Sequence, residues 1–121
     1  MRLYSFEKLE VWQLGRNLTK NIYKISRGFP DDERFGLTSQ IRRAVVSVTS
    51  NIAEGSSRQS GKEQARFTEI SFGSLLEILN QLIVANDLEY ITEDTINKER
   101  PLIEEIGNKL NKLRESQLRK K

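Results

Sequence analysis

The stretch QIRRAVVSVTSNIAEGSSR, residues 40–58, decides the fold. It begins with apolar residues spaced as on one side of an α-helix and crowds β-branched residues into its middle. It ends in small polar residues, one acid and a glycine. Such an ending is typical of a loop, of an active site, or of a surface that another helix approaches closely. The choice among these separates an enzyme from an assembly.

Helical spacing of apolar residues continues through almost the whole chain, and no segment alternates for long between apolar and polar residues. The sequence predicts a single domain over residues 1–121. We expect helices at roughly 6–27, 38–55, 61–88 and 93–117, with a basic tail at 118–121. Long helices joined by short links are typical of an all-α, up-down-up-down antiparallel four-helix bundle.

Several residues predict where these helices begin, end or bend. Hydroxyl side chains before a helix accept hydrogen bonds from its first backbone N–H groups, and glycine adopts the left-handed conformation that ends many helices. Proline inside a helix removes a backbone donor. We therefore expect N-caps at Thr38 and Thr92, a capping box from Ser60 to Glu63, a helix end at Gly55, and a kink or restart at Pro101.

The apolar arc of the expected helix 61–88 is unusually wide. It spans about 180°, whereas a surface helix in a small bundle needs a stripe of about 100°. Trp12 and Tyr23 also lie on the flank of the first apolar stripe, where a single bundle seam does not require them. We interpret this excess as a sign that a partner chain covers part of the molecule.

The chain contains no cysteine and no histidine, which excludes a thiol nucleophile, an imidazole base and histidine-ligated zinc or iron. We expect no metal and no cofactor. The acids at Asp31, Asp32 and Glu33 follow Pro30 in a polar turn, so we interpret them as turn and cap residues instead of metal ligands.

A line of polar residues runs along the opening stretch. Arg43, Ser47, Ser50 and Glu54 share one side of the helix, and Asn51 lies beside them. We favour a polar network at a helix–helix contact, in which Arg43 and Glu54, about 16 Å apart by helix rise, each need a partner on another helix or chain. The alternative is a carboxylate-dependent enzyme such as a nuclease, with catalysis by Glu54, Asn51 and Ser47.

Charge is unevenly distributed. Residues 1–66 carry 12 Lys/Arg and 7 Asp/Glu, residues 67–97 carry 6 acids and no Lys/Arg, and residues 98–121 carry 8 Lys/Arg and 4 acids. Cations at helical spacing can follow nucleic-acid phosphates without reading base sequence, whereas the alternative is an ordinary solvated surface. The candidate nucleic-acid-binding residues are a basic ridge of Arg16, Lys20, Lys24 and Arg27, extended by Arg42 and Arg58, with Lys62 and Arg66 beyond.

The first apolar stretch contains acids, so it does not resemble a secretory signal. No run of about 18 apolar residues occurs, so we expect no membrane-spanning segment. These features predict a soluble, cytoplasmic protein.

Three stretches, FEKLEVWQLGRNL, FPDDERFGLTSQIRRAVVSVTSNIAEGSSR and FTEISFGSLLEILNQL, resemble the four-helix bundle proteins encoded in intervening sequences of 23S ribosomal RNA genes. The retroelement accessory variability determinants are similar to this family. The resemblance covers about residues 6–91. The chain departs from it at Thr49, where proline is common, and at Glu89, where glycine is common. The signature positions are Gln40, Arg43, Ser47, Asn51, Glu54, Gly55 and Arg58, then Gly73, Ser74 and Glu77.

The resemblance implies a ring-like homopentamer, and its retroelement relatives bind nucleic acid and a reverse transcriptase. We therefore expect a non-enzymatic homo-oligomer with a backbone-directed, salt-sensitive affinity for RNA or DNA. The alternative is a structural adaptor oligomer that binds a protein such as a reverse transcriptase. The basic ridge is not part of the family signature, so nucleic-acid binding rests on the charge pattern alone.

Overall fold

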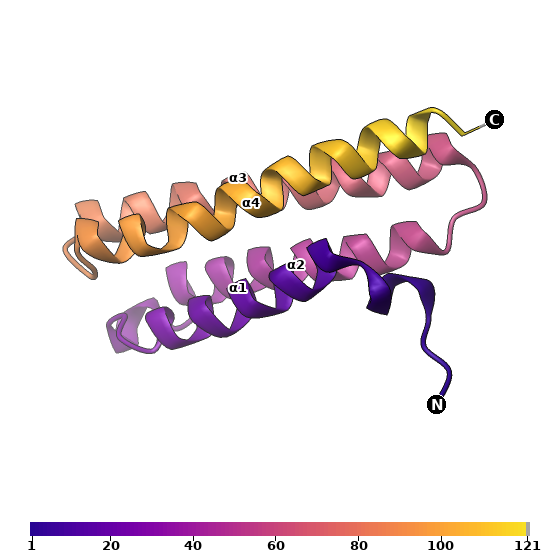
Figure 1. The fold of residues 1–121 in the computed structure, drawn as a ribbon. Helices are drawn as coiled ribbons and strands as arrows, with labels where there is room; N and C mark the ends of the chain where they lie inside the picture. The colour runs from indigo at the N-terminus through magenta and orange to yellow at the C-terminus, as the bar shows by residue number, and fades with distance from the viewer. Residues whose placement is uncertain (121) are drawn as a thin grey trace.

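The computed structural model describes residues 1–120 and contains no β-strand within them. Its four long helices alternate in direction along the chain, as Figure 1 shows. Each helix packs against the next, and the last packs against the first. The predicted all-α four-helix bundle is therefore confirmed. The helices are α1 (Glu10–Ser26), α2 (Leu37–Ser56), α3 (Gly61–Asp87) and α4 (Glu93–Leu118), with 3-10 helices at Ser5–Lys8 and Asp31–Glu33.

Apolar stripes from all four helices meet in one core, as their spacing predicts. The central positions of α1, α2 and α4 are buried where the sequence places them, and α3 lies between α2 and α4. The largest buried apolar side chains are Leu18 and Ile22 of α1, Ile41, Val45 and Val48 of α2, Leu75, Ile78 and Leu82 of α3, and Ile106 and Leu110 of α4.

The first helix begins later than predicted. Residues 5–8 form a 3-10 turn and Leu9 is extended, so α1 starts at Glu10 instead of residue 6. The Phe6 ring packs edge-on against Trp12 with centroids 5.0 Å apart, and the side-chain amide of Gln13 donates to the Glu7 carbonyl at 2.9 Å. These contacts fold residues 5–8 back onto α1, which a continuous helix does not allow.

The bounds of α2 lie within one residue of the prediction, but the predicted roles of Thr38 and Gly55 at its ends are wrong. The helix begins one residue before Thr38, because the Glu33 carboxylate accepts a hydrogen bond from the Leu37 backbone N–H at 3.0 Å. Gly55 does not adopt the left-handed conformation; α2 continues through it to Ser56. Gly55 is instead a point of close packing, because an added Cβ would lie 2.9 Å from the Cβ of Phe67 on α3.

The caps of α3 and α4 agree better with the sequence. The Ser60 hydroxyl accepts a hydrogen bond from the Glu63 N–H at 3.1 Å, and Thr92 occupies the N-cap position of α4, although its side chain makes no capping bond. Of the predicted kink or restart at Pro101, the restart is wrong, since α4 is one continuous helix with the proline inside it. Pro101 is exposed, as is Asn97 four residues earlier, so water can reach the carbonyl that lost its helical partner.

Glu89, between α3 and α4, has φ of 66° and is the one non-glycine residue with positive φ within residues 1–120. This is the position at which the resemblance leads us to expect glycine. Left-handed backbone brings the Cβ of an L-residue close to its own carbonyl, which glycine avoids. The departure at Glu89 therefore places strain in this turn.

The composition of α3 also suits a membrane-crossing helix, with a mean hydropathy of 1.2 over an 18-residue window, 39% of which is buried within the chain. Core helices of soluble bundles meet the same criterion. Its buried polar residues, among them Thr68, Ser71 and Gln81, face neighbouring helices. The α3 helix is a core helix of this bundle with an apolar outer side.

Candidate nucleic-acid interface

Four cations stand on the outer side of α1. Arg16, Lys20, Lys24 and Arg27 are all exposed, and none takes part in an ion pair among residues 1–120. No acid occurs between Val11 and Pro30, so their field is not neutralised along the helix. The Arg16 guanidinium lies 5.0 Å from the Trp12 ring centroid, which holds it against the helix surface. The predicted basic ridge is a continuous exposed row.

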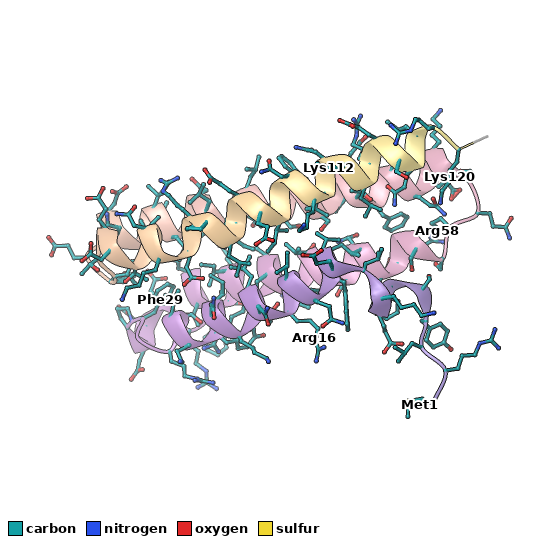
Figure 2. The ribbon with its side chains drawn as sticks, in the orientation of Figure 1. Met1, Arg16, Phe29, Arg58, Lys112 and Lys120 are labelled. Atoms are coloured by element: carbon teal, nitrogen blue, oxygen red, sulfur yellow. The ribbon has the colours of Figure 1, made fainter. Side chains whose placement is uncertain are left out.

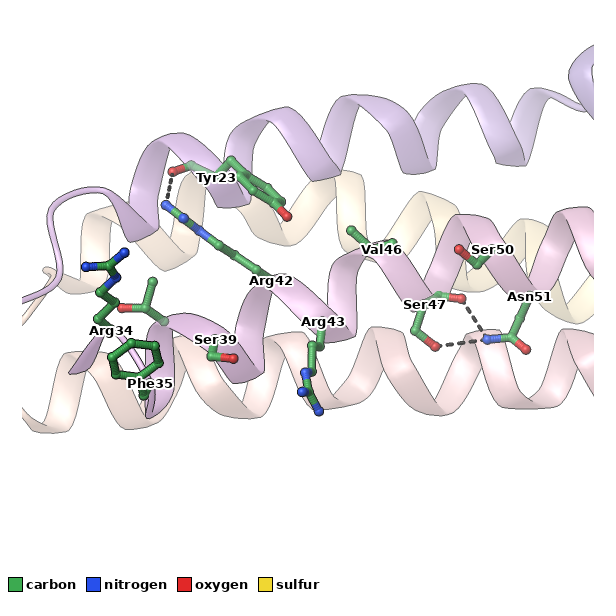
Figure 3. A pocket seen from close by; sticks show the side chains of 11 residues that line it. Tyr23, Arg34, Phe35, Ser39, Arg42, Arg43, Val46, Ser47, Ser50 and Asn51 are labelled. Carbon is green, nitrogen blue, oxygen red and sulfur yellow. Dashed lines mark hydrogen bonds between the residues drawn. The ribbon is translucent and has the colours of Figure 1, made fainter.

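Arg42 lies between helices and is not part of this row. Its Nε donates to the Ser26 hydroxyl at 2.8 Å, a terminal nitrogen reaches the Tyr23 carbonyl at 3.4 Å, and its guanidinium stacks 4.6 Å from the Tyr23 ring centroid. Figure 3 shows this side chain crossing from α2 to α1. These contacts join α1 and α2 through Arg42 and Tyr23, and Trp12 packs on Phe6.

Arg58 is also engaged within the chain. It follows the end of α2, pairs with Glu54 at 4.0 Å and lies 4.6 Å from the Phe67 ring centroid. Figure 2 shows Arg58 beside the α2–α3 connection, whereas Arg16 lies on the outer side of α1. Arg58 therefore does not share a surface with the ridge. The candidate interface consists of the four cations on α1.

The polar line on α2 forms a hydrogen-bonded network against α3. The hydroxyls of Ser47 and Ser74 lie 2.8 Å apart, and the Asn51 amide donates to the Ser47 hydroxyl at 2.9 Å and to its carbonyl at 2.8 Å. Small side chains let the two helices approach while each polar atom keeps a partner. The favoured interpretation, a polar network at a helix–helix contact, is confirmed for Ser47 and Asn51, whose partner on α3 is Ser74.

The ends of that line behave differently. Glu54 is exposed and pairs with Arg58 of its own chain at 4.0 Å, so within the described residues its partner is not on another helix. Within the described residues its carboxylate makes no hydrogen bond to Ser47 or Asn51, and the geometry does not assemble them as a catalytic group. Ser50 and Arg43 are exposed.

The remaining signature residues contribute unequally to the fold. The side-chain amide of Gln81 donates to Glu77 at 3.1 Å and approaches Gln40 at 3.5 Å, which links α3 to α2. Gly55 permits close packing, as described above. Gly73 does not: an added Cβ there would meet no atom within 4 Å.

Two interhelical hydrogen bonds were not predicted. Thr68 donates to the Gln117 side chain at 2.7 Å, and Ser71 donates to the Val48 carbonyl at 2.8 Å, both fully inside the bundle. The only sequence signal for them is a hydroxyl within the wide apolar arc of α3, since their partners come from distant parts of the chain.

Glu33, the last of the three turn acids, is a capping residue. Its carboxylate accepts hydrogen bonds from the Leu37 N–H and, at 2.8 Å, from the Tyr90 hydroxyl. These two bonds, the first more than the second, lower the pKa of Glu33, and the same contact raises the pKa of Tyr90. Among residues 1–120, no three acidic side chains gather as a metal site.

A family model described as 23S rRNA-intervening sequence protein matches residues 7–112, which include α1, α2, α3 and most of α4. The chain belongs to this family. The predicted resemblance is thereby confirmed. No curated protein matches the chain. The family description names ribosomal RNA genes and no activity, so the role of this 23S rRNA-intervening sequence protein has to be argued from its surface.

Proposed function

We propose that this family member is a non-enzymatic, ring-like homopentamer that binds the phosphate backbone of RNA or DNA through the outer side of α1. The observation that carries the nucleic-acid role is the exposed, unpaired row of Arg16, Lys20, Lys24 and Arg27 in an acid-free segment. Eleven residues of helix separate its ends, which is about 16 Å by helix rise and long enough to meet several successive phosphates.

Backbone recognition has a specific signature in salt. If each ridge cation replaces one counterion, the plot of log affinity against log salt has a slope of about −3 to −4 for the four cations. Binding of this kind also discriminates weakly among sequences, because phosphates carry no sequence information.

The test is a fluorescence anisotropy titration of labelled RNA and DNA over about 50–200 mM salt. A ridge variant, R16Q/K20Q/K24Q/R27Q, is compared with K98Q/R100Q/K112Q/R119Q on α4. The control also removes two arginines and two lysines. All four occupy exposed positions and form no ion pair within residues 1–120. We expect the ridge variant to lose affinity and salt dependence and the control to keep most of both. Equal losses in both variants would show that net charge alone matters.

Assembly is supported by exposed apolar side chains on α3, of which Leu76 is 51% exposed in the isolated chain. Light scattering coupled to size exclusion gives the mass directly. A stable monomer at micromolar concentration would remove the oligomer from the proposal, and a defined mass other than five copies would correct the ring size.

The second candidate function is an adaptor oligomer that holds a protein such as a reverse transcriptase. Leu3 and Tyr4, in the N-terminal segment that stands away from the bundle in Figure 1, are exposed and favour a protein contact there. Recovery of one defined protein with the wild-type chain after nuclease treatment, and its loss with L3S/Y4S, would favour this function. Loss of all partners on nuclease treatment would favour nucleic acid.

A further inference from the structure

The outer side of α2 carries positive charge without any acid. From Arg34 to Ala53 the sequence contains three arginines and no Asp or Glu. Figure 3 shows an open groove along this side, about 690 Å³ in volume, bordered by Arg34, Phe35 and Arg43. Phe35 is 89% exposed and Val46 is 41% exposed, and small side chains such as Ser39 and Ser50 also line the groove. We call this set the α2 face.

The outer side of α3 has the opposite charge. From Phe67 to Asn97 the sequence contains six acids and no Lys or Arg. Exposed Ile70, Leu76 and Ile83 lie among these acids. We call the set of Ile70, Gly73, Leu76, Glu77, Ile83 and Asp87 the α3 face.

Gly73 is the part of the α3 face that its own chain does not explain. Glycine inside a helix weakens it relative to alanine, so a glycine in the middle of a 27-residue helix needs a packing reason. Nothing lies within 4 Å of where its Cβ would be. Close approach of another molecule to the α3 backbone supplies that reason.

We propose that the α3 face of one copy docks on the α2 face of the next copy. The inference rests on the proposed assembly and identifies the surfaces that form it. The charges of the two faces indicate that a second copy binds here. The α2 face carries unpaired arginine and exposed apolar residues, and the α3 face of a second copy carries acids and exposed apolar residues. The serines on one side and Gly73 on the other allow the two helices to approach closely.

The two faces differ, so the contact is heterologous. An open row of copies keeps one α2 face free at one end and one α3 face free at the other until the assembly closes. The helices α2 and α3 are neighbours in the bundle and their outer sides face different directions, which turns successive copies around toward a closed ring. The contact leaves the ridge on α1 uncovered in every copy, so assembly multiplies the cations available to one nucleic acid.

The test is a charge exchange between copies. Variant one, R34E/R43E, makes the α2 face acidic, and variant two, E77K/D87K, makes the α3 face basic. Each variant alone sets like charges against each other, so we expect each to be monomeric at concentrations where the wild type assembles. A mixture of the two restores opposite charges at both kinds of junction, so we expect a species larger than a monomer that contains both variants.

The mixture also separates this contact from pairing inside one chain. Arg43 and Glu77 lie on neighbouring helices, so combining the changes in one chain could restore an intrachain interaction, but mixing two chains cannot. The control K98E/R100E reverses two exposed cations on α4, outside both faces and the ridge, and should assemble as the wild type does. Circular dichroism checks that every variant is folded.

The outcomes are distinguishable. Single variants that assemble like the wild type, or a mixture that stays monomeric, would overturn this interface. A mixture that stays monomeric while R34E/R43E loses RNA binding would assign the α2 face to nucleic acid. A monomeric wild type would overturn the assembly itself, whatever the variants do.

Gly73→Gln gives an independent measurement. The new side chain enters open space in the single chain, so the monomer should fold and melt at the same temperature or higher. It should weaken association at least tenfold, because it blocks approach to the α3 backbone. Asn108→Gln, on an exposed position of α4, is the matched control. Normal association of Gly73→Gln would contradict close approach at this glycine.

Discussion

The two sides of α3 are both apolar, yet only one is covered. Leu75 is 1% exposed and contacts the core, whereas Leu76, the next residue, is 51% exposed. The inner side meets α2 and α4, whereas Ile70, Leu76 and Ile83 on the outer side stay exposed. Helical spacing therefore identifies which residues favour burial, but a neighbouring element has to cover them before their burial stabilises the fold.

The largest expected effect contrasts these two leucines. Leu75→Ala should lower the free energy of unfolding by about 2–5 kcal/mol, because it removes buried methyl groups and leaves a cavity. Leu76→Ala should change the stability of the isolated chain by less than about 0.5 kcal/mol. Urea denaturation with both variants at several protein concentrations measures this.

The dependence of stability on protein concentration separates the effects of the two substitutions. A loss caused by Leu75→Ala belongs to the fold and should persist on dilution. Any loss caused by Leu76→Ala belongs to association and should disappear on dilution, because assembly stabilises only by mass action. Equal and concentration-independent losses would mean that the outer side is covered within the chain.

Two glycines of α3 also differ in whether another part of the chain covers them, and smaller changes in stability are expected there. At Gly61 an added Cβ would lie 2.0 Å from the Gln117 backbone oxygen, whereas at Gly73 it would meet nothing. Gly61→Ala should therefore destabilise by about 1–3 kcal/mol through overpacking. Gly73→Ala should stabilise the isolated chain by about 0.5–1 kcal/mol through helix propensity.

Thermal unfolding followed by circular dichroism measures both changes. Gly28→Ala serves as a control, because its Cβ would make an ordinary 3.5 Å contact with the Ile25 carbonyl. If Gly61→Ala were neutral, the start of α3 would not pack against α4 as closely as described.

Most of the fold could be predicted from the sequence because apolar spacing and turn residues act locally. The four helices lie within a few residues of their predicted bounds except at the start of α1, where packing of Phe6 on Trp12 prevails over helical spacing. Gly55 was misread for a similar reason. A glycine serves equally as a helix end or as a close contact, and only the position of Phe67 decides between them.

The candidate site was predicted only in part. The cations on α1 could be identified because they share one side of one helix. Arg42 and Arg58 could not be placed in the same way, since their distances to Tyr23 and Phe67 depend on how different helices pack. The network of Ser47, Asn51 and Ser74 was predicted as a type of contact, although its α3 partner was not.

A substitution in the turn after α3 is expected to raise the free energy of unfolding by a smaller amount. Glu89 has φ of 66°, in the left-handed region that favours glycine. Glu89→Gly should raise the free energy of unfolding by up to about 1 kcal/mol, because relief of strain exceeds the entropy that glycine adds to the unfolded chain. Glu89→Ala keeps the Cβ and should bring no such gain. Chemical denaturation distinguishes them, and a gain with alanine alone would contradict the role of strain.

The smallest effect concerns the polar contact that joins this turn to the start of α2. Hydrogen bonds from Leu37 N–H and the Tyr90 hydroxyl lower the pKa of Glu33, so its ionised form stabilises the folded chain above the usual pKa of 4.5. As the pH falls below 4.5 and through the lowered pKa, protonation removes that contribution. Glu33→Gln should therefore be less stable than the wild type near neutral pH and approach it in acid. Glu104→Gln, at an exposed position on α4, should run parallel to the wild type. Urea titrations at a series of pH values measure the difference, and a constant gap between Glu33→Gln and the wild type would show that the carboxylate charge is not what stabilises this junction.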